Sequence, residues 1–255
     1  MTKSAAELFD LTGKVALVAG GSRGMGREMV LAFARAGADV VIASRRLESC
    51  ETVAREVETE TGRRALAQAC HVGRWADLDR LADAAYAAFG KVDVLVNNAG
   101  MSPVYDRVAD VTEELYDKVL AVNLKGPFRL TALVGTRMAA GAGGSIINVS
   151  SVGAIRPYGG IVPYAAAKAG VNAMTIAFAH AFGPKVRVNC IMPGSFLTDL
   201  TRSWDMNEFN TKQAPRFALR RAGQASEIVG AALYLASDAS SYTTGAILRV
   251  DGGVP

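Results

Sequence analysis

Short runs of β-branched and other apolar residues alternate with longer helix-forming segments along the chain from Lys14 onward. Strands separated by segments of helical length form βαβ units, in which successive strands run parallel and the helices cover the sheet. Runs such as Val40-Val41-Ile42 and Val94-Leu95-Val96 are apolar without interruption, as in strands buried on both faces. The alternation therefore predicts an α/β fold with a doubly wound parallel sheet and helices on both faces.

The segment boundaries predict one Rossmann-like sheet of about seven strands. We place strands near 14–19, 39–43, 65–69, 92–96, 144–149, 185–190 and 246–250, and helices near 24–36, 47–60, 75–88, 112–139, 164–182 and 225–236. No internal repeat, Pro/Ser-rich linker or low-complexity segment divides the chain, so one domain over 1–255 is simpler than two. The segment 195–221 mixes Trp204 and Phe209 with polar residues without a clear period, and we expect a substrate-binding flap there.

Charge and composition argue against several kinds of binding partner and site. The 28 basic and 24 acidic residues give a formal net charge of +4, and the basic residues are scattered, so we expect no nucleic-acid partner. The three cysteines are far apart and lack CxxC or His spacing, which predicts neither a disulfide framework nor a metal site. The N-terminus lacks a signal-peptide core, and the apolar stretch 171–182 is too short for a bilayer span. We expect a cytoplasmic protein with no membrane partner.

A glycine-rich loop follows the first predicted strand directly and precedes an amphipathic helix. Glycine permits a tight turn there, and it lets backbone N–H groups and the helix N-terminus approach a pyrophosphate. A glycine cluster alone is as often an ordinary turn, but the strand before it and the helix after it favour a dinucleotide-binding loop. The candidate cofactor-binding residues in this loop are Gly20, Ser22, Arg23, Gly24, Met25 and Gly26.

The residues after the second strand bear on the choice of cofactor. In NAD-selective sites a carboxylate at this position binds the ribose 2′-hydroxyl, whereas here Ser44-Arg45-Arg46 follow the strand. A guanidinium pairs well with a 2′-phosphate, and Arg23 can reach the same group from the glycine loop. The alternative is that Arg45 and Arg46 are solvated charges at the start of a surface helix. We predict that NADP(H) is preferred, with NAD(H) as the alternative, and that Ser44 and Arg45 bind it.

Three further segments carry a family resemblance: Asn97-Asn98-Ala99-Gly100, Ser150-Ser151 and Tyr164-Ala165-Ala166-Ala167-Lys168. Together with the loop at 19–26 they resemble the short-chain dehydrogenase/reductase family, and its 3-oxoacyl reductase-like members in particular. The resemblance extends from Gly13 to Gly253, and it includes Asn123 in Val-Asn-Leu and the Pro193-Gly194 turn followed by Thr198. A lone YxxxK motif carries little information, whereas the whole set in this order and spacing is highly specific.

The residues themselves also indicate a proton-transfer site. Tyr164 and Lys168 are one helical turn apart, so the ammonium can lie near the phenol and favour the phenolate, which would lower the pKa of Tyr164 from its usual ~10. Tyr164 would donate a proton to a carbonyl oxygen during reduction and remove it during oxidation. Ser151 follows the fifth strand, and its hydroxyl would hold the substrate oxygen. In isolation, such residues are more often a packed ring, a solvated amine and a turn-forming serine.

The family resemblance implies interconversion of a secondary alcohol and a ketone, or of an aldehyde and its alcohol, with hydride from a nicotinamide. It implies that Asn123 maintains a water-linked proton path through Lys168, that the Lys168 ammonium bonds the nicotinamide ribose, and that Thr198 holds the carboxamide. Asn97 and Gly100 would line the cofactor cleft. The resemblance adds Asn98, Ala99, Gly100, Tyr164, Lys168, Pro193, Gly194 and Thr198 to the cofactor-binding set, and it implies a homotetramer or homodimer.

One departure from the family pattern concerns the adenine. After the third strand the family commonly has an Asp-Val pair whose Asp bonds the adenine amino group, but this chain has His71-Val72. A neutral histidine can accept one hydrogen bond or stack on the base, so we expect both residues to contact the cofactor with altered adenine recognition.

The sequence leaves the substrate open. A 3-oxoacyl thioester and a sugar or polyol both fit the resemblance, because the flap and the loop 101–111 would shape the pocket. A function of another class is a catalytically silent dinucleotide-binding scaffold or sensor of the same fold. Such a protein would be expected to have lost Ser151, Tyr164 or Lys168, and all three are present.

Overall fold

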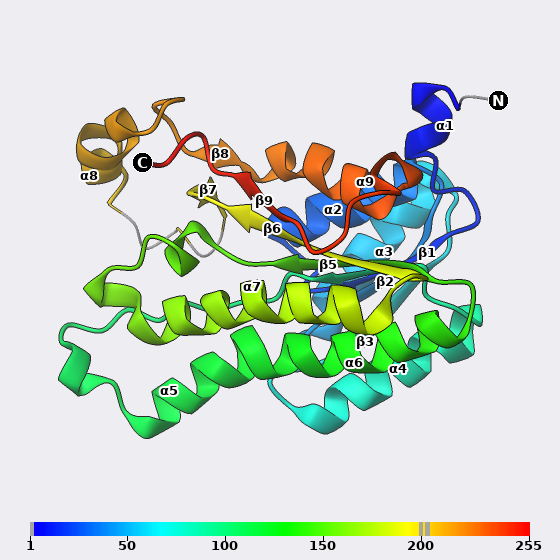
Figure 1. Cartoon of the computed structure of the whole chain (residues 1–255), viewed down its shortest axis with the longest axis horizontal. Helices are drawn as coiled ribbons and strands as arrows, with labels where there is room; N and C mark the ends of the chain where they lie inside the picture. Colours follow the sequence, from blue (N-terminus) through cyan, green and yellow to red (C-terminus); the bar gives the residue numbers. More distant parts are fainter. Residues whose placement is uncertain (1–2, 199–200, 202–204) are drawn as a thin grey trace.

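Seven parallel strands form the central sheet in the order β3-β2-β1-β4-β5-β6-β9 (Figure 1). The structure is a computed structural model that describes residues 3–198, 201 and 205–255. The strands are β1 (Val15–Ala19), β2 (Asp39–Ser44), β3 (Ala65–Ala69), β4 (Val94–Asn97), β5 (Gly144–Val149), β6 (Val186–Pro193) and β9 (Ile247–Val250). The predicted Rossmann-like sheet is confirmed, and the order of its strands reverses between β1 and β4. Connections diverge there, which opens a crevice at the carboxyl ends of the strands.

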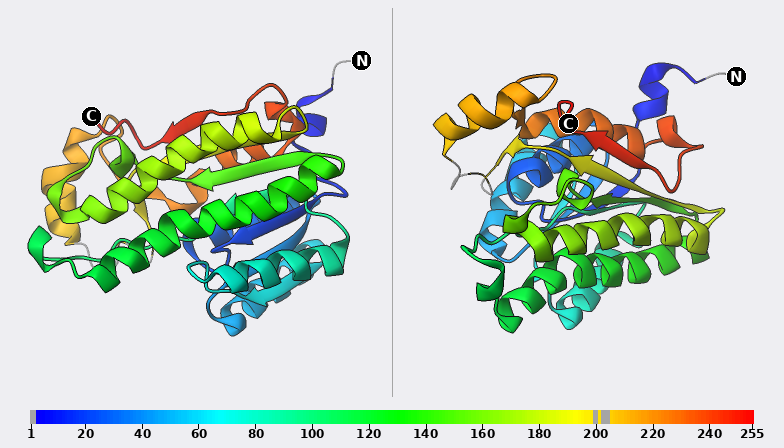
Figure 2. Two further views of the ribbon diagram at one scale, coloured as in Figure 1. Left: turned by 60° about the horizontal axis from the view of Figure 1, so that its bottom comes forward. Right: turned by 60° about the vertical axis from the view of Figure 1, so that its left-hand side comes forward.

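Helices cover both faces of the sheet (Figure 2). They are α1 (Ala5–Phe9), α2 (Gly24–Arg35), α3 (Leu47–Thr61), α4 (Trp75–Phe89), α5 (Glu113–Leu120), α6 (Gly126–Ala140), α7 (Val162–Phe182), α8 (Met206–Glu208) and α9 (Val229–Ala236). One apolar core joins α2, α3 and α9 to the sheet through side chains such as Phe33, Val57 and Leu235. A second core joins α4 and α6 to the opposite face through Leu81 and Leu130. The helices that cover the sheet therefore bury apolar side chains against strand surfaces that are themselves apolar.

The long helix expected over 112–139 is interrupted. A π-helical turn, Ala121–Lys125, separates α5 from α6. Asn123 lies in this turn, and its side-chain Nδ2 donates to the carbonyl of Val119 at 2.9 Å and to that of Met101 at 2.8 Å. Gly126 then passes so close to the carbonyl oxygen of Val72 that a Cβ would lie 2.2 Å from it. The prediction of one helix is wrong because these contacts, made to distant segments, favour an inserted residue here.

Further differences lie near the carboxyl end of the sheet. The helix expected at 225–236 begins as a 3-10 turn, Ala225–Ile228, before α9. A two-stranded parallel sheet, β7 (Phe196–Leu197) with β8 (Gly223–Gln224), was not predicted. Both strands are too short to produce a recognisable alternation of apolar and polar residues.

The segment expected to form a flap, 195–221, contains β7, α8 and a π-helical turn, Phe209–Gln213. Phe209, Phe217 and two alanines form a small apolar cluster of their own, against which Leu197 and Val254 pack. The backbone N–H of Leu219 donates to the carbonyl of Gly252 at 2.9 Å, so the segment is tied to the residues that follow β9. Figure 1 shows α8 beside the C-terminal residues. Trp204 lies outside the described residues.

A buried polar network fastens two helices to the central strands. Asn97 in β4 donates through Nδ2 to Thr131 in α6 at 2.9 Å and to the side-chain oxygen of Asn148 in β5 at 2.8 Å. Asn148 in turn donates to Thr175 in α7 at 2.9 Å. All four side chains are buried. Because a buried polar group without a partner is costly, this network fixes how α6 and α7 sit on the sheet.

No helix among the described residues is both long enough and apolar enough to cross a membrane.

Two helical glycines should respond oppositely to the same substitution. A Cβ at Gly135 in α6 would lie 2.4 Å from Cε2 of Phe182, whereas a Cβ at Gly230 in α9 would meet nothing within 4 Å. We expect Gly135→Ala to lower the free energy of unfolding by about 1–3 kcal/mol through overpacking. Gly230→Ala should raise it by up to about 1 kcal/mol through helix propensity. Urea unfolding followed by circular dichroism measures both, and a Gly135→Ala protein as stable as the wild type would contradict the described packing of α6 on α7.

Candidate active site

A cleft of about 310 Å³ lies at the carboxyl ends of the strands. Its lining includes most of the residues predicted to bind a cofactor: Gly20, Ser22, Arg23, Gly24, Met25, Ser44, Arg45, His71, Val72, Asn98, Ala99, Gly100 and Thr198. The strand ends of β1, β2, β3 and β4 therefore contribute to one continuous hollow. Sequence motifs that lie far apart along the chain meet here because parallel strands end at the same edge of the sheet.

Four lining residues were not predicted: Cys70, Met101, Lys118 and Val122. Cys70 and Met101 are direct sequence neighbours of predicted residues, so extending each motif by one position would have found them. Lys118 and Val122 come from the end of α5 and the π-helical turn. No motif marks them, because their approach to the cleft depends on how α5 packs.

The backbone of the glycine loop packs so closely against neighbouring backbone that two of its positions have no room for a side chain. Gly20 has φ +87°, and a Cβ on it would lie 2.7 Å from the backbone nitrogen of Ala99. Gly26 packs under the loop, where a Cβ would lie 2.0 Å from the carbonyl oxygen of Gly20. The side-chain Nδ2 of Asn98 donates to that same carbonyl at 2.9 Å. The loop therefore keeps its backbone close to the cleft at the start of α2, as a bound pyrophosphate requires.

The charges around the cleft suit a polyanion. Among the described residues that line it, Arg23, Arg45 and Lys118 are basic and none is a carboxylate. Arg45 is exposed just beyond the end of β2, and across the described ranges no acidic side chain forms an ion pair with it. Backbone N–H groups, a helix N-terminus and the exposed guanidinium of Arg45 together fit the phosphates of a dinucleotide.

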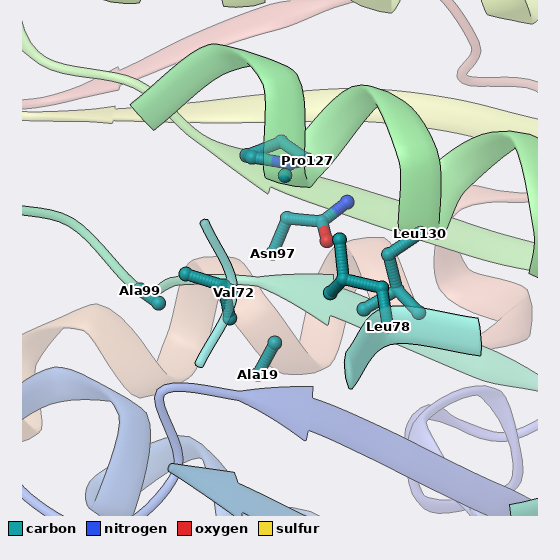
Figure 3. A pocket seen from close by; sticks show the side chains of 8 residues that line it. Ala19, Val72, Leu78, Asn97, Ala99, Pro127 and Leu130 are labelled. Atoms are coloured by element: carbon teal, nitrogen blue, oxygen red, sulfur yellow. The ribbon is translucent and has the colours of Figure 1, made fainter. Parts of the chain in front are cut away.

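Asn97 does not line this cleft, which corrects the expectation from the family resemblance. Its amide points toward α6 and donates to Thr131 and Asn148, as the side chain between Pro127 and Leu130 in Figure 3 indicates. The small cavity drawn there, of about 10 Å³, lies beneath the cleft between the sheet, α4 and α6. The neighbouring Asn98, not Asn97, faces the glycine loop. Alternation along a strand explains this, since successive side chains point to opposite faces.

Ser151 and Tyr164 come together beyond the cleft. Ser151 follows β5, and its Oγ accepts a hydrogen bond from the backbone N–H of Gly153 at 3.1 Å. Tyr164 lies in the first turn of α7, and the Ser151 side chain is near enough to its hydroxyl to lower the pKa of the phenol. The serine hydroxyl and the phenol therefore face one point, where a substrate oxygen can contact both.

Lys168 is buried one turn further along α7. Its Nζ donates to the carbonyl of Val149 at 2.8 Å and lies 5.7 Å from the centroid of the Tyr164 ring. A Cβ built on Gly100 would lie 3.6 Å from this Nζ and 3.0 Å from Oδ1 of Asn123. The end of β4, the π-helical turn and α7 thus meet around the ammonium, and the predicted association of Asn123, Ser151, Tyr164 and Lys168 is present in the geometry.

Asn123 is fully engaged with the backbone. Besides the two carbonyls that its Nδ2 reaches, its Oδ1 accepts a hydrogen bond from the backbone N–H of Met101 at 3.1 Å. The π-helical turn thus holds the loop after β4 in place beside Lys168. The part in a water-linked proton path that the family resemblance implies for Asn123 stays a prediction.

Burial dominates the titration of both candidate proton-transfer groups. It raises the pKa of the Tyr164 phenol, an effect that the hydrogen bond from Ser151 partly opposes. It lowers the pKa of Lys168 to about 8. The direction for Tyr164 is opposite to the one expected from the charge of Lys168, because the spacing of the two residues does not reveal how much of the water around them the protein displaces.

The remaining predicted residues belong to the segment that follows β6. Pro193 ends β6, and the backbone N–H of Gly194 donates to the carbonyl of Val250 at 3.0 Å. The chain then turns toward the glycine loop, so that a Cβ on Gly24 would lie 3.5 Å from Thr198. Pro193, Gly194, Tyr164 and Lys168 do not line the cleft itself. Only Thr198 of this stretch reaches it.

Comparison with known proteins agrees with this arrangement. Residues 19–255 match a family model described as enoyl-(acyl carrier protein) reductase. Dehydrogenase/reductase SDR family member 4 of Homo sapiens is 34% identical over 247 residues, which cover 96% of this chain and 88% of that protein.

Two solved structures have closely similar backbones. A 7α-hydroxysteroid dehydrogenase complexed with NADH and 7-oxo glycochenodeoxycholic acid has a TM-score of 0.94 at 34% identity, and the match covers 99% of this chain and 98% of that one. A gluconate 5-dehydrogenase from Burkholderia cenocepacia in complex with NADP and tartrate has a TM-score of 0.92 at 34% identity, covering 98% of both chains. The likeness extends over nearly the whole of each chain.

The buried ammonium predicts a specific dependence of stability on pH. Below about pH 8, Lys168 is charged in both the folded and the unfolded chain, and its burial lowers stability. Between pH 8 and its ordinary 10.5, the unfolded chain holds the proton that the folded chain has lost, so stability rises with pH. Relative to Lys168→Met, the wild type should gain about 3 kcal/mol over this interval in urea unfolding. A wild-type-minus-variant difference that does not change with pH would contradict this assignment.

Proposed function

The chain belongs to the short-chain dehydrogenase/reductase family of oxidoreductases, and we propose that it interconverts a secondary alcohol and a ketone, or an aldehyde and its alcohol, with NADP(H) as the preferred cofactor. The observation that carries the proposal is the meeting of Ser151, Tyr164 and Lys168 beside a cleft that suits a dinucleotide. A bound nicotinamide would supply the hydride in reduction or accept it in oxidation.

Tyr164 is the proposed general acid and base. Because burial raises its pKa, the phenol keeps its proton at neutral pH and can donate it to a carbonyl oxygen. In the oxidative direction it removes the hydroxyl proton, for which a phenolate is needed. Pro103, Tyr105, Ile161 and Pro163 line a small cavity of about 10 Å³ beside Tyr164, and these mostly apolar surroundings favour the neutral phenol over the phenolate.

Ser151 and Lys168 support this proton transfer in different ways. The Ser151 hydroxyl, which acts on the pKa of the phenol, is proposed to hold the substrate oxygen at the same point. The ammonium of Lys168 is fixed by the carbonyl of Val149, and its pKa of about 8 lets it exchange a proton near neutral pH. The substrate is proposed to be a small or medium-sized carbonyl compound, which would lie between Tyr164 and the loop 101–111, whose Pro103 and Tyr105 line a small cavity beside that tyrosine.

The preference for NADP(H) rests on this chain's own residues. The similar structures include one complexed with NADH and one with NADP, so likeness alone does not choose between the cofactors. Here Arg45 follows β2 where an NAD-selective site has a carboxylate, and Arg23 lines the same cleft. We propose that Arg45 pairs with the 2′-phosphate.

Loss of the phenol hydroxyl should abolish most turnover. We expect Tyr164→Phe to reduce kcat/KM for carbonyl reduction about a thousandfold, since the variant has no proton to donate, while leaving the Kd for NADPH unchanged. Activity is measured as oxidation of NADPH with a panel of ketones and aldehydes. The matched control is Tyr242→Phe, because that ring is fully exposed at 103% of its reference area. Equal rates for Tyr164→Phe and the wild type would overturn the assignment of the acid.

Removal of the guanidinium after β2 should weaken binding of one cofactor only. We expect Arg45→Ala to raise the Kd for NADPH about tenfold and to leave the Kd for NADH unchanged, because only NADPH carries the 2′-phosphate. Titration of the cofactor fluorescence gives both constants. Arg46→Ala is the control, since its neighbour Arg45 lines the cleft and Arg46 does not. Equal wild-type affinity for the two cofactors, unchanged in Arg45→Ala, would contradict the assignment.

A further inference from the structure

The loop 101–111 is fixed to the start of α7, beside the candidate proton donor. The hydroxyl of Tyr105 donates to the carbonyl of Gly159 at 2.8 Å and accepts the backbone N–H of Val162 at 2.7 Å. Tyr164 follows Val162 by two residues in the first turn of α7. The loop therefore meets the chain that enters α7 next to the group proposed to transfer the proton. The inference below rests on that proposed function.

The side chains around this meeting point offer a polar substrate little to bind. The described residues that line the small cavity beside Tyr164 include no charged group, and all of them except the two tyrosines are apolar: Pro103, Leu115, Val119, Ile161 and Pro163. Tyr105 has a single hydroxyl hydrogen, which it donates to Gly159. Among these lining side chains, Tyr164 alone can therefore donate a hydrogen to an oxygen of a sugar or polyol.

The charged side chains nearby supply no ready site for an acidic substrate either. The basic residues within 101–111 and within 151–162, the segment that runs from β5 into α7, are Arg107 and Arg156. Arg107 pairs through Nη2 with the aspartate three residues on at 2.7 Å, and the Nε of Arg156 donates to the carbonyl oxygen of Pro255 at 3.0 Å. Each guanidinium is thus engaged, and the carboxylate of a sugar acid would have to displace one of these contacts.

Apolar side chains are nevertheless exposed on both segments. They are Val104 in the loop and Ile155, Tyr158 and Val162 in the segment 151–162. This segment packs against the proton donor, since a Cβ built on Gly153 would lie 2.9 Å from Cδ1 of Ile161 and 3.7 Å from Cε1 of Tyr164. Single exposed apolar residues are ordinary, whereas a group of them beside a reaction centre indicates a contact surface.

Tyr158 is the largest exposed side chain of this group, with a relative exposure of 66%. A Cβ built on Gly160 would lie 3.0 Å from its Cε2, and the backbone N–H of Ile161 donates to its carbonyl at 3.1 Å, so the turn after it holds one edge of the ring. Its phenol is close enough to Tyr164 to add to the effect of burial in raising the pKa of that residue. An aromatic surface is thus open to solvent beside the reacting hydroxyl.

We propose that Tyr158 determines substrate specificity: its exposed ring, together with Ile155 and Val162, packs against an apolar substituent of the substrate while Tyr164 contacts the carbonyl oxygen. The substrates are then ketones and aldehydes with an aliphatic or aromatic chain, and polyhydroxylated carbonyl compounds are poor substrates. Each methylene group that leaves water against these side chains lowers the free energy of the bound state. Such binding energy, although remote from the reacting carbon, contributes to kcat/KM. Of the two substrate classes that the sequence leaves open, this selects acyl chains over sugars and polyols.

The test is a homologous series of ketones with NADPH as the hydride donor. From 2-butanone to 2-octanone the reacting group stays the same and the apolar chain grows by one methylene at a time. We expect the kcat/KM of the wild type to rise about threefold per added methylene. Erythrulose has the carbon skeleton of 2-butanone with a hydroxyl group on each carbon that is not the carbonyl, and its kcat/KM should be at least about tenfold lower than that of 2-butanone.

Two substitutions of Tyr158 separate the ring from its hydroxyl. Tyr158→Ser removes the ring and should reduce the gain to less than about 1.5-fold per methylene, whereas Tyr158→Phe keeps the ring and should retain the wild-type series. Because the side chain is exposed and does not line the cofactor cleft, both variants should fold and bind NADPH with an unchanged Kd. Tyr242→Ser is the matched control, since it removes an exposed ring elsewhere and should leave the series as in the wild type.

Three results would overturn the inference and leave the oxidoreductase proposal intact. They are a wild-type series that does not rise with chain length, erythrulose as good a substrate as 2-butanone, and the same series in Tyr158→Ser as in the wild type. A changed oligomeric state of Tyr158→Ser with an unchanged series would assign the ring to a contact between copies of the chain instead. If the wild type oxidises neither NADPH nor NADH with any ketone or aldehyde, the proposed function fails, and the inference with it.

Discussion

The buried hydrogen bond between Asn148 in β5 and Thr175 in α7 holds the longest helix of the protein against the central strands. Asn148 also accepts from Asn97, which in turn reaches Thr131 in α6, so two strands and two helices share one network. Because these groups are buried, each broken bond would leave an unpaired polar atom at a cost of about 1–3 kcal/mol. The helix α7 therefore has one favoured position on the sheet. This position determines how far Tyr164 lies from β5.

Burial by the surrounding protein also moves the pKa values of Tyr164 and Lys168 apart. An isolated tyrosine and an isolated lysine titrate within about one pH unit of each other. Here burial raises the pKa of the phenol and lowers that of Lys168 to about 8, because both charged forms lose solvation. The proton is thus held more firmly by Tyr164 than by Lys168. Of the effects on the Tyr164 phenol, only the interaction with Ser151 lowers its pKa.

The sequence predicts those features that depend on neighbouring residues or on strand ends. The sheet, the glycine loop and the grouping of Ser151, Tyr164 and Lys168 follow from periodicity and from motifs that parallel strands bring to one edge. The π-helical turn at Asn123 does not, because its cause is a contact with Met101 in another segment. The approach of Lys118 to the cleft depends likewise on tertiary packing, which single-sequence periodicity does not encode.

The segment around Phe209 and Phe217 has an apolar cluster separate from the two cores that cover the sheet. Substitutions there should have little effect on the packing of the strands that position the cleft, because this cluster shares no residue with either of the two larger cores. A library of substitutions confined to the cluster should consequently retain a high fraction of folded members, since the two cores that cover the sheet keep all of their side chains.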